Sequence, residues 1–103
     1  MSKQLLLWDV YEITSENSSL NGVMLRGRIR KLGLEKGFNV LVENAEDIEN
    51  GVRFAVLDHK DRDEIENYLM GAVEGVQICQ VLEKCPNPIL SKLKVNIASR
   101  YAL

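Results

Sequence analysis

The chain is poor in the side chains that bind metals or crosslink small domains. It contains two cysteines and one histidine among 103 residues. Cys79 and Cys85 lie six positions apart without Cys-x-x-Cys spacing, and His59 is distant from both in sequence. Because zinc needs about three or four ligands, we expect no metal site and no cofactor. Both thiols are expected to be reduced and to lie packed or half exposed.

Long apolar runs are also missing. No unbroken apolar run exceeds four residues, the length of the run from Leu5 to Trp8, whereas a helix that spans a bilayer needs about 20. The start of the chain lacks the basic, apolar and small-residue layout of a secretory signal. We therefore expect a cytoplasmic protein with no membrane partner.

An excess of positive charge is absent too. The net charge is −2 and the pI is near 5.4, which argues against a protein that coats nucleic acid, because phosphate neutralisation needs a broad basic surface. Aromatic residues make up only 6% of the chain. Trp8, Tyr11, Phe38 and Phe54 fall in expected strands, where we interpret them as core rather than as a base-stacking platform.

The remaining composition is that of a small globular protein. With 46% hydrophobic and 27% charged residues, the chain should fold without a metal or disulfide. Its length fits one domain with one core, spanning residues 1–103.

Hydrophobic periodicity changes several times along the chain. Leu25, Ile29 and Leu32 recur at helical spacing between basic residues, which predicts a short amphipathic helix. Asn21 is its expected N-cap, and glycines in the region 33–37 are expected to end it. The other elements are predicted from alternation, from helical spacing and from turn residues. They are a strand over 4–13, a hairpin of strands 38–43 and 52–57 turning at Asn50-Gly51, a helix over 61–75 capped by Asp61 or Asp63, a strand over 76–82, a break at Pro86 to Pro88, and a last strand from Leu93 to Ile97.

This order of elements predicts an α+β fold of the ferredoxin-like type. In that split βαβ sandwich, an antiparallel sheet carries two helices on one face. The fold hosts many unrelated activities, so function has to be argued from particular residues.

Two segments resemble the acylphosphatase family. Residues 18–26 read Ser-Ser-Leu-Asn-Gly-Val-Met-Leu-Arg, which is similar to the family's signature Gly-x-Val-Gln-Gly-Val-x-Phe-Arg between the first strand and the first helix. Gly22, Val23 and Arg26 are identical to it, whereas Ser18 replaces a glycine. Residues 37–44 resemble the family's second strand, which ends in the catalytic asparagine. Asn44 follows Arg26 by eighteen positions, as in the family, and a rival alignment with a shorter helix also keeps Asn44.

The resemblance implies an acylphosphatase that hydrolyses the carboxyl-phosphate bond by in-line attack of water, without metal. Arg26 and Asn44 would be the catalytic residues, with Asn44 orienting the water. A loop that turns into a helix start directs several N–H groups at one point, where an anion can bind, and the arginine fork can close over phosphate oxygens. The implied phosphate-binding residues are Ser19, Leu20, Asn21, Gly22, Val23, Met24 and Arg26.

A second interpretation stays open. The chain departs from the family at Ser18, in a longer approach to the loop, in a missing strand tryptophan and at Ala45, so a non-catalytic module that binds an anion, or one that pairs through its sheet edges, is the alternative. The expected partners are a small acyl phosphate or inorganic phosphate, and a monomer is expected. We interpret Arg28, Arg30 and Lys31 as solvated helix residues and His59 as a surface residue in a turn.

Overall fold

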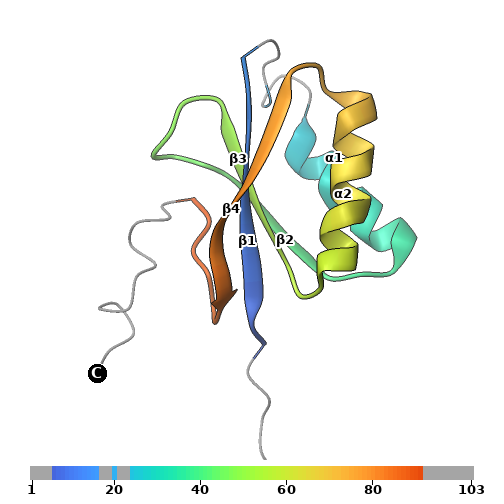
Figure 1. Cartoon of the computed structure of the whole chain (residues 1–103), viewed down its shortest axis with the longest axis vertical. Helices are drawn as coiled ribbons and strands as arrows, with labels where there is room; N and C mark the ends of the chain where they lie inside the picture. The colour runs from blue at the N-terminus through green and yellow to red at the C-terminus, as the bar shows by residue number, and fades with distance from the viewer. Residues whose placement is uncertain (1–5, 17–19, 21–23, 92–103) are drawn as a thin grey trace, which may run out of the picture.

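The chain folds into one sheet flanked by two helices (Figure 1). The computed structural model describes residues 6–16, 20 and 24–91. The elements, in chain order, are β1 (Trp8–Ser15), α1 (Leu25–Lys36), β2 (Val40–Asn44), β3 (Gly51–Val56), α2 (His59–Ala72) and β4 (Val76–Cys85). The order βαββαβ agrees with the prediction, whereas the expected last strand from Leu93 to Ile97 lies outside the described residues.

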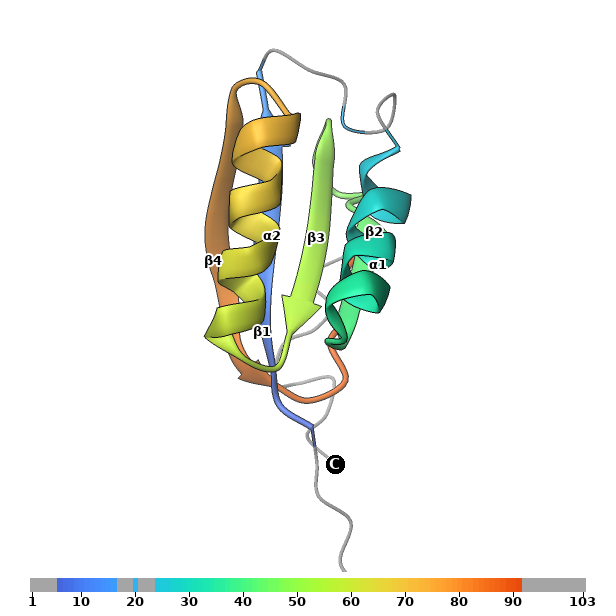
Figure 2. The same cartoon turned by 90° about the vertical axis from the view of Figure 1, so that its right-hand side faces the viewer.

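The four strands lie in the order β2-β3-β1-β4, and each neighbouring pair is antiparallel. Both helices lie on one face of this sheet, as Figure 2 shows with the helices in front. The arrangement is the ferredoxin-like α+β sandwich, which confirms the predicted fold class. Among the described residues, β2 and β4 are thus the two edge strands of the sheet.

The main core lies between the sheet and the helices. Successive strand residues point to opposite faces, so Val52, Phe54 and Val56 of β3 pack with buried residues of both helices, such as Ile29 and Leu69. A smaller cluster lies on the other face of the sheet. It consists of Trp8, Val10, Ala55 and Leu90. As the imperfect alternation of the first strand suggested, both faces of the sheet carry buried apolar residues.

Helix α1 begins later than predicted. It starts at Leu25, and the residue before it, Met24, is left-handed with φ 54° and makes no side-chain cap. Asn21, the predicted cap, lies outside the described residues. The helix ends as expected at Gly37, whose φ of 76° is left-handed and whose N–H donates to Gly33 O at 2.8 Å. Glycine adopts that conformation without steric cost.

Helix α2 begins earlier than predicted. Its N-cap is Asp58, whose carboxylate accepts from Lys60 N–H at 2.9 Å, so the proposal of Asp61 or Asp63 as cap was wrong. Because Asp58 follows the end of β3 so closely, the chain enters the helix at once. His59 is the first helical residue rather than part of a turn, and its side chain is exposed, as expected.

The strand ends also differ from the expectation. Leu6 and Leu7 are exposed and lie before β1, because the pairing of β1 with β3 stops at Asp9 opposite Val56. Strand β4 continues past its predicted end to Cys85, where it pairs with Trp8. Cys85 is buried and Cys79 is exposed.

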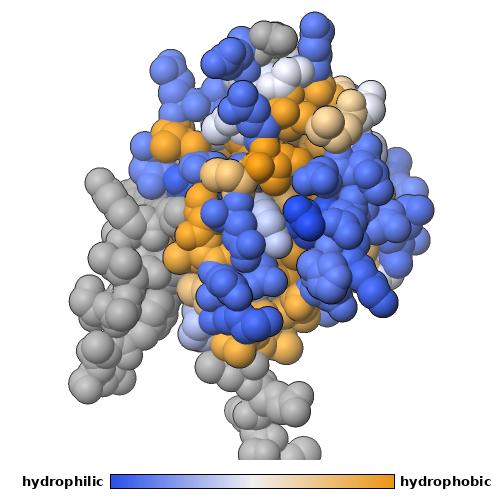
Figure 3. All heavy atoms as spheres, in the orientation of Figure 1, coloured by the Kyte–Doolittle hydropathy of each residue, from blue (hydrophilic) through white to orange (hydrophobic). Residues whose placement is uncertain are grey.

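Hydrophilic side chains cover the helical side of the molecule (Figure 3). Among the described residues, neither helix has the length and apolar character needed to cross a bilayer.

Candidate active site

The two predicted catalytic side chains border the same hollow. Arg26 lies in the first turn of α1, and Asn44 is the last residue of β2, the strand on which α1 packs. The hollow has a volume of about 220 Å³. It is lined by Leu20, Met24, Leu25, Arg26, Gly27, Arg30 and Asn44. Residues eighteen positions apart in the sequence thus meet where a helix begins and an edge strand ends.

The start of α1 suits an anion. The first N–H groups of a helix have no intrahelical acceptor, and the helix dipole places partial positive charge there. The first turn contains no acidic residue. The N–H of Leu25 donates to Leu20 O at 3.3 Å, and the N–H of Arg28 donates to Met24 O at 3.2 Å.

The main-chain donor predicted at Leu20 is engaged inside the protein. Its N–H donates to Asn50 Oδ1 at 2.8 Å, and Asn50 Nδ2 donates to Ser15 O at 2.7 Å. Leu20 therefore does not have its expected role as a phosphate donor, because its N–H already donates to Asn50 in the β2–β3 turn. Met24 lines the hollow and is exposed. The other predicted phosphate-binding residues, Ser19, Asn21, Gly22 and Val23, lie outside the described residues.

One acid approaches the arginines of the hollow. Glu43 Oε2 lies 3.8 Å from Arg26 Nη1, and its Oε1 lies 3.9 Å from Arg30 Nη2. The neighbours of Glu43 in β2 face the helices, so its own side chain starts on the opposite face. It reaches α1 because β2 is an edge strand. All three side chains are about half exposed, and such pairs contribute little to stability.

Arg30 was interpreted from the sequence as a solvated residue, but it lines the hollow. Its Nη2 donates to Val42 O at 3.1 Å, so the side chain lies across the edge of β2. The signal that could have found it is its position four residues after Arg26, which puts both arginines on one helix face. Arg28 is exposed on the same helix and, like Lys31, agrees with the solvated interpretation.

A larger groove adjoins the hollow along β2. Its volume is about 500 Å³. It is lined by Arg30, Val40, Leu41, Val42, Glu43, Glu46, Pro88, Ile89, Leu90 and Ser91. Figure 2 shows the chain after β4 crossing the sheet at the lower end of the view towards the side of β2. There Glu46 N–H donates to Ser91 O at 2.7 Å, which holds the second wall of the groove.

A third hollow of about 310 Å³ lies on the other side of Arg30. It is lined by Arg30, Leu34, Phe38, Asn39 and Val40. Arg30 is thus shared by all three hollows described here.

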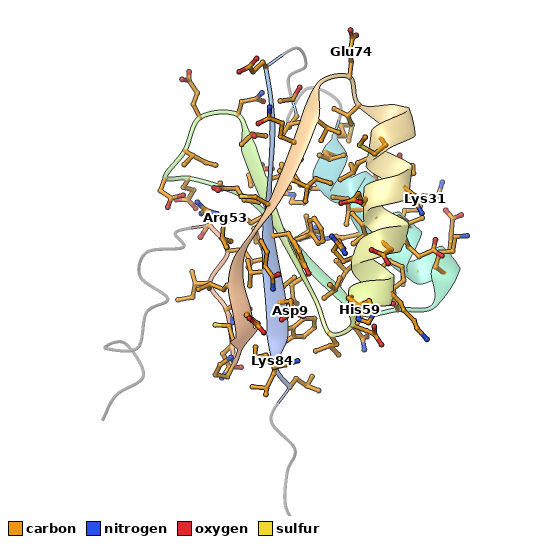
Figure 4. All side chains as sticks on the ribbon, in the orientation of Figure 1. Asp9, Lys31, Arg53, His59, Glu74 and Lys84 are labelled. Atoms are coloured by element: carbon orange, nitrogen blue, oxygen red, sulfur yellow. The ribbon has the colours of Figure 1, made fainter. Side chains whose placement is uncertain are left out.

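A second arginine cluster lies on the sheet face away from the helices. Arg53 is 3% exposed, and its guanidinium donates to Asp47 at 2.6 Å, to Glu12 at 3.0 Å and to Leu90 O at 2.9 Å. Figure 4 shows Arg53 beside the chain that follows β4. These bonds fasten the β2–β3 turn and the segment after β4 to the sheet, so we interpret this cluster as structural.

Tyr11 also belongs to the framework rather than to the hollow. It is buried and stacks on Phe54 with ring centroids 5.2 Å apart. Burial, followed by the charge of Asp9, raises the pKa of its hydroxyl above 10.0, and the nearby Arg62 partly opposes that change. Trp8, Tyr11 and Phe54 are thus core residues, as expected, and Phe38 is partly buried.

No protein-family model matches the chain, and a search of curated proteins finds no relative. The resemblance to acylphosphatases therefore depends on the residues themselves and on where the fold places them.

Proposed function

We propose that the chain hydrolyses acyl phosphates. The observation that supports this proposal is that Arg26 and Asn44 border one hollow at the start of α1. The resemblance assigns them complementary tasks: the guanidinium holds the phosphoryl group and the carboxamide aims a water. The substrate is a small acyl phosphate, the protein acts as a monomer in the cytoplasm, and no cofactor is part of the proposal.

The reaction makes modest demands on the protein. The water oxygen bonds to phosphorus, the bond from phosphorus to the acyl oxygen breaks, and its electron pair leaves on the carboxylate. The phosphate product keeps the two protons of the water. Because the carboxylate leaves readily, the protein mainly has to position the reactants and stabilise charge. An arginine and an amide side chain suffice for that.

The loose pairing of Arg26 favours this role. Its contact with Glu43 is 3.8 Å long and about half exposed, so a phosphoryl group can replace the carboxylate at small cost. A planar guanidinium offers two parallel N–H donors to phosphate oxygens. The start of α1, where Arg26 lies, also favours an anion, because the first N–H groups of a helix can donate to its oxygens.

The alternative is a module that binds an anion without turning it over. Two observations favour it: Glu43 places a negative charge beside the arginines, and Asn50 occupies the Leu20 N–H. A weaker cradle could bind phosphate yet fail to stabilise the transition state, because catalysis depends on contacts that strengthen as the reaction proceeds.

Hydrolysis of benzoyl phosphate without added metal tests the enzyme proposal. We expect Arg26→Ala and Asn44→Ala each to lower kcat by about 10²- to 10³-fold, the usual effect of losing one transition-state donor. Arg28→Ala and Asn67→Ala are matched controls on exposed helix positions and should retain the parent rate. Equal rates for all five proteins would refute the catalytic assignment.

Thermal unfolding with inorganic phosphate tests the alternative. A ligand stabilises only the state that it binds, so phosphate should raise the Tm of the parent and of Arg28→Ala, but not that of Arg26→Ala. This shift without hydrolysis would support the binding module. No shift and no hydrolysis would exclude both and leave a module that pairs through its sheet edges.

A further inference from the structure

We propose that Arg30 receives the leaving carboxylate and that the groove along β2 holds the acyl group of the substrate. This inference rests on the proposed function and adds a substrate class to it: acyl phosphates whose acyl group is uncharged, apolar and larger than acetyl. It also assigns a catalytic role to a residue outside the family-like motifs.

The position of Arg30 carries the first step of the inference. The hollow of Arg26 and Asn44 and the groove along β2 have Arg30 as a shared wall. The two spaces also meet along β2, since Glu43 lines the groove and the next residue, Asn44, lines the hollow. An acyl group attached to a phosphoryl group in the hollow can therefore extend into the groove, and it would lie next to Arg30 where the two spaces join.

The state of the Arg30 side chain carries the second step. Its Nη2 is bonded to Val42 O at 3.1 Å, which fixes the guanidinium at the edge of β2. A guanidinium has five N–H donors, and the side chain is 52% exposed. Arg30 is thus positioned by one hydrogen bond and keeps donors for a ligand. A fixed donor costs little reorganisation when charge develops beside it.

The composition of the groove decides which acyl groups fit. About half of its wall is apolar, to which the exposed Leu41 of β2 and the half-buried Ile89 of the segment after β4 contribute. Its volume of about 500 Å³ lies in the range of ligand pockets and exceeds what an acetyl group would fill. Glu43 and Glu46 also line it, and these acids would repel an acyl group that carries its own negative charge.

The chemistry gives Arg30 a defined task. As the bond from phosphorus to the acyl oxygen breaks, its electron pair moves to that oxygen and a carboxylate forms. Negative charge therefore grows on the leaving oxygen, which lies between the phosphoryl group and the acyl group. An arginine at the junction of the two spaces can donate to that oxygen. Its contribution should be largest for the poorest leaving groups.

The groove is tested by comparing kcat/KM for acetyl phosphate and benzoyl phosphate. In Leu41→Ser we expect kcat/KM for benzoyl phosphate to fall about 10-fold more than kcat/KM for acetyl phosphate, since lost apolar contact in a pocket is worth about that factor. Met70→Ser is the matched control, an exposed apolar residue on α2. An unchanged preference in Leu41→Ser, with its Tm within a few degrees of the parent, would overturn the groove assignment.

Arg30 is tested with benzoyl phosphates whose leaving carboxylates span a range of pKa. Single-turnover rates of Arg30→Gln should depend more steeply on leaving-group pKa than those of the parent, and Arg30→Lys should restore part of the parent's slope. Arg28→Gln should retain the parent's slope. If Arg30→Gln lowers the single-turnover rate by the same factor for every leaving group, Arg30 acts on the phosphoryl group or on the fold. That result would overturn its role at the leaving oxygen.

The outcomes also separate this inference from the function beneath it. Suppose that the parent hydrolyses acetyl phosphate in an Arg26-dependent way, that Leu41→Ser keeps the parent's preference for benzoyl phosphate, and that Arg30→Gln slows every substrate equally. Only the further inference is then lost. If the parent hydrolyses neither substrate, the proposed function fails first.

Discussion

Two groups of ion pairs, one formed by Arg53 and one by Arg26 and Arg30, differ in how tightly their charges are paired. Arg53 is 3% exposed, and its ion pairs with Asp47 and Glu12 measure 2.6 and 3.0 Å. Arg26 and Arg30 are about half exposed, and both lie near 3.8 to 3.9 Å from Glu43. The tight group holds segments of the chain together, whereas the loose group is open to solvent and, on our proposal, exchanges its acid for a phosphoryl group.

The physical basis of the difference is burial. A buried charge that loses its partner remains in a medium of low polarity, so breaking the pair is costly. An exposed charge that loses its partner is solvated by water and screened by salt. The same residue type therefore stabilises the fold where it is buried and stays available where it is exposed.

The largest expected effect is the loss of Arg53. Arg53→Met leaves Glu12 and Asp47 without their cation, which should lower the free energy of unfolding by about 3–5 kcal/mol. Urea unfolding measures it. Arg26→Met should stay within about 0.5 kcal/mol of the parent, as is usual for surface positions.

A compensating variant keeps this test decisive if Arg53→Met does not fold. Adding Glu12→Gln and Asp47→Asn removes the two carboxylate charges that Arg53 had faced and should recover part of the loss. If Arg53→Met is as stable as Arg26→Met, the contrast between the two groups is wrong.

The fold was predictable because its signals are local. The helical spacing in α1 corresponds to its buried face, and the apolar run in β3 corresponds to a strand that is buried throughout. The ends of elements were less predictable, because they depend on distant partners. Strand β1 begins at Trp8 rather than at residue 4, since its pairing starts at Asp9 with β3 and at Trp8 with β4. Similarly, three acids near the start of α2 could cap it, and only the path of the chain from β3 selects Asp58.

The candidate site was predictable only in part. Arg26 and Asn44 came from a resemblance, and the structure places both at one hollow. Arg30 and Glu43 were missed because their contact passes around the edge of β2, and the sequence does not state which strand is the edge. The engagement of Leu20 by Asn50 depends on residues thirty positions apart. Long-range contacts of this kind leave no local pattern.

The Asn50 side chain links Leu20, which lines the hollow, to Ser15 of β1. Its replacement gives the next largest effect on stability. Asn50→Gly keeps the left-handed backbone, with φ 52°, but removes the acceptor for Leu20 N–H and the donor to Ser15 O. We expect a loss of about 1–3 kcal/mol, because the Leu20 N–H then lacks its acceptor. Lys84→Gly is the matched control, since Lys84 is exposed and left-handed with φ 51°. Equal losses in urea unfolding would contradict the role of the Asn50 side chain.

Glu43→Gln sharpens the comparison from the side of the loose group. Removing the carboxylate should strengthen binding of inorganic phosphate by about 3- to 10-fold at low salt, because a charge several ångströms from the anion repels it through a partly aqueous medium. The gain should shrink at high salt, and stability should hardly change. Titration calorimetry measures the Kd. Glu35→Gln, an exposed change elsewhere on α1, should leave it unchanged, and an unchanged Kd in Glu43→Gln would mean that this acid does not face the anion.

The smallest effect concerns Asp61, which lies near two other acids at the start of α2. Burial, and then the charges of Asp58 and Glu64, raise the pKa of Asp61 above its ordinary value of 3.8. The folded state therefore holds this proton more tightly than the unfolded state, so stability falls as pH rises from 3.8 through the raised pKa. Above that window Asp61→Asn should raise the Tm by no more than about 2 °C, and below pH 3 or so the two proteins should melt together. A gain that persists in acid would show that the cause is not the ionisation of Asp61.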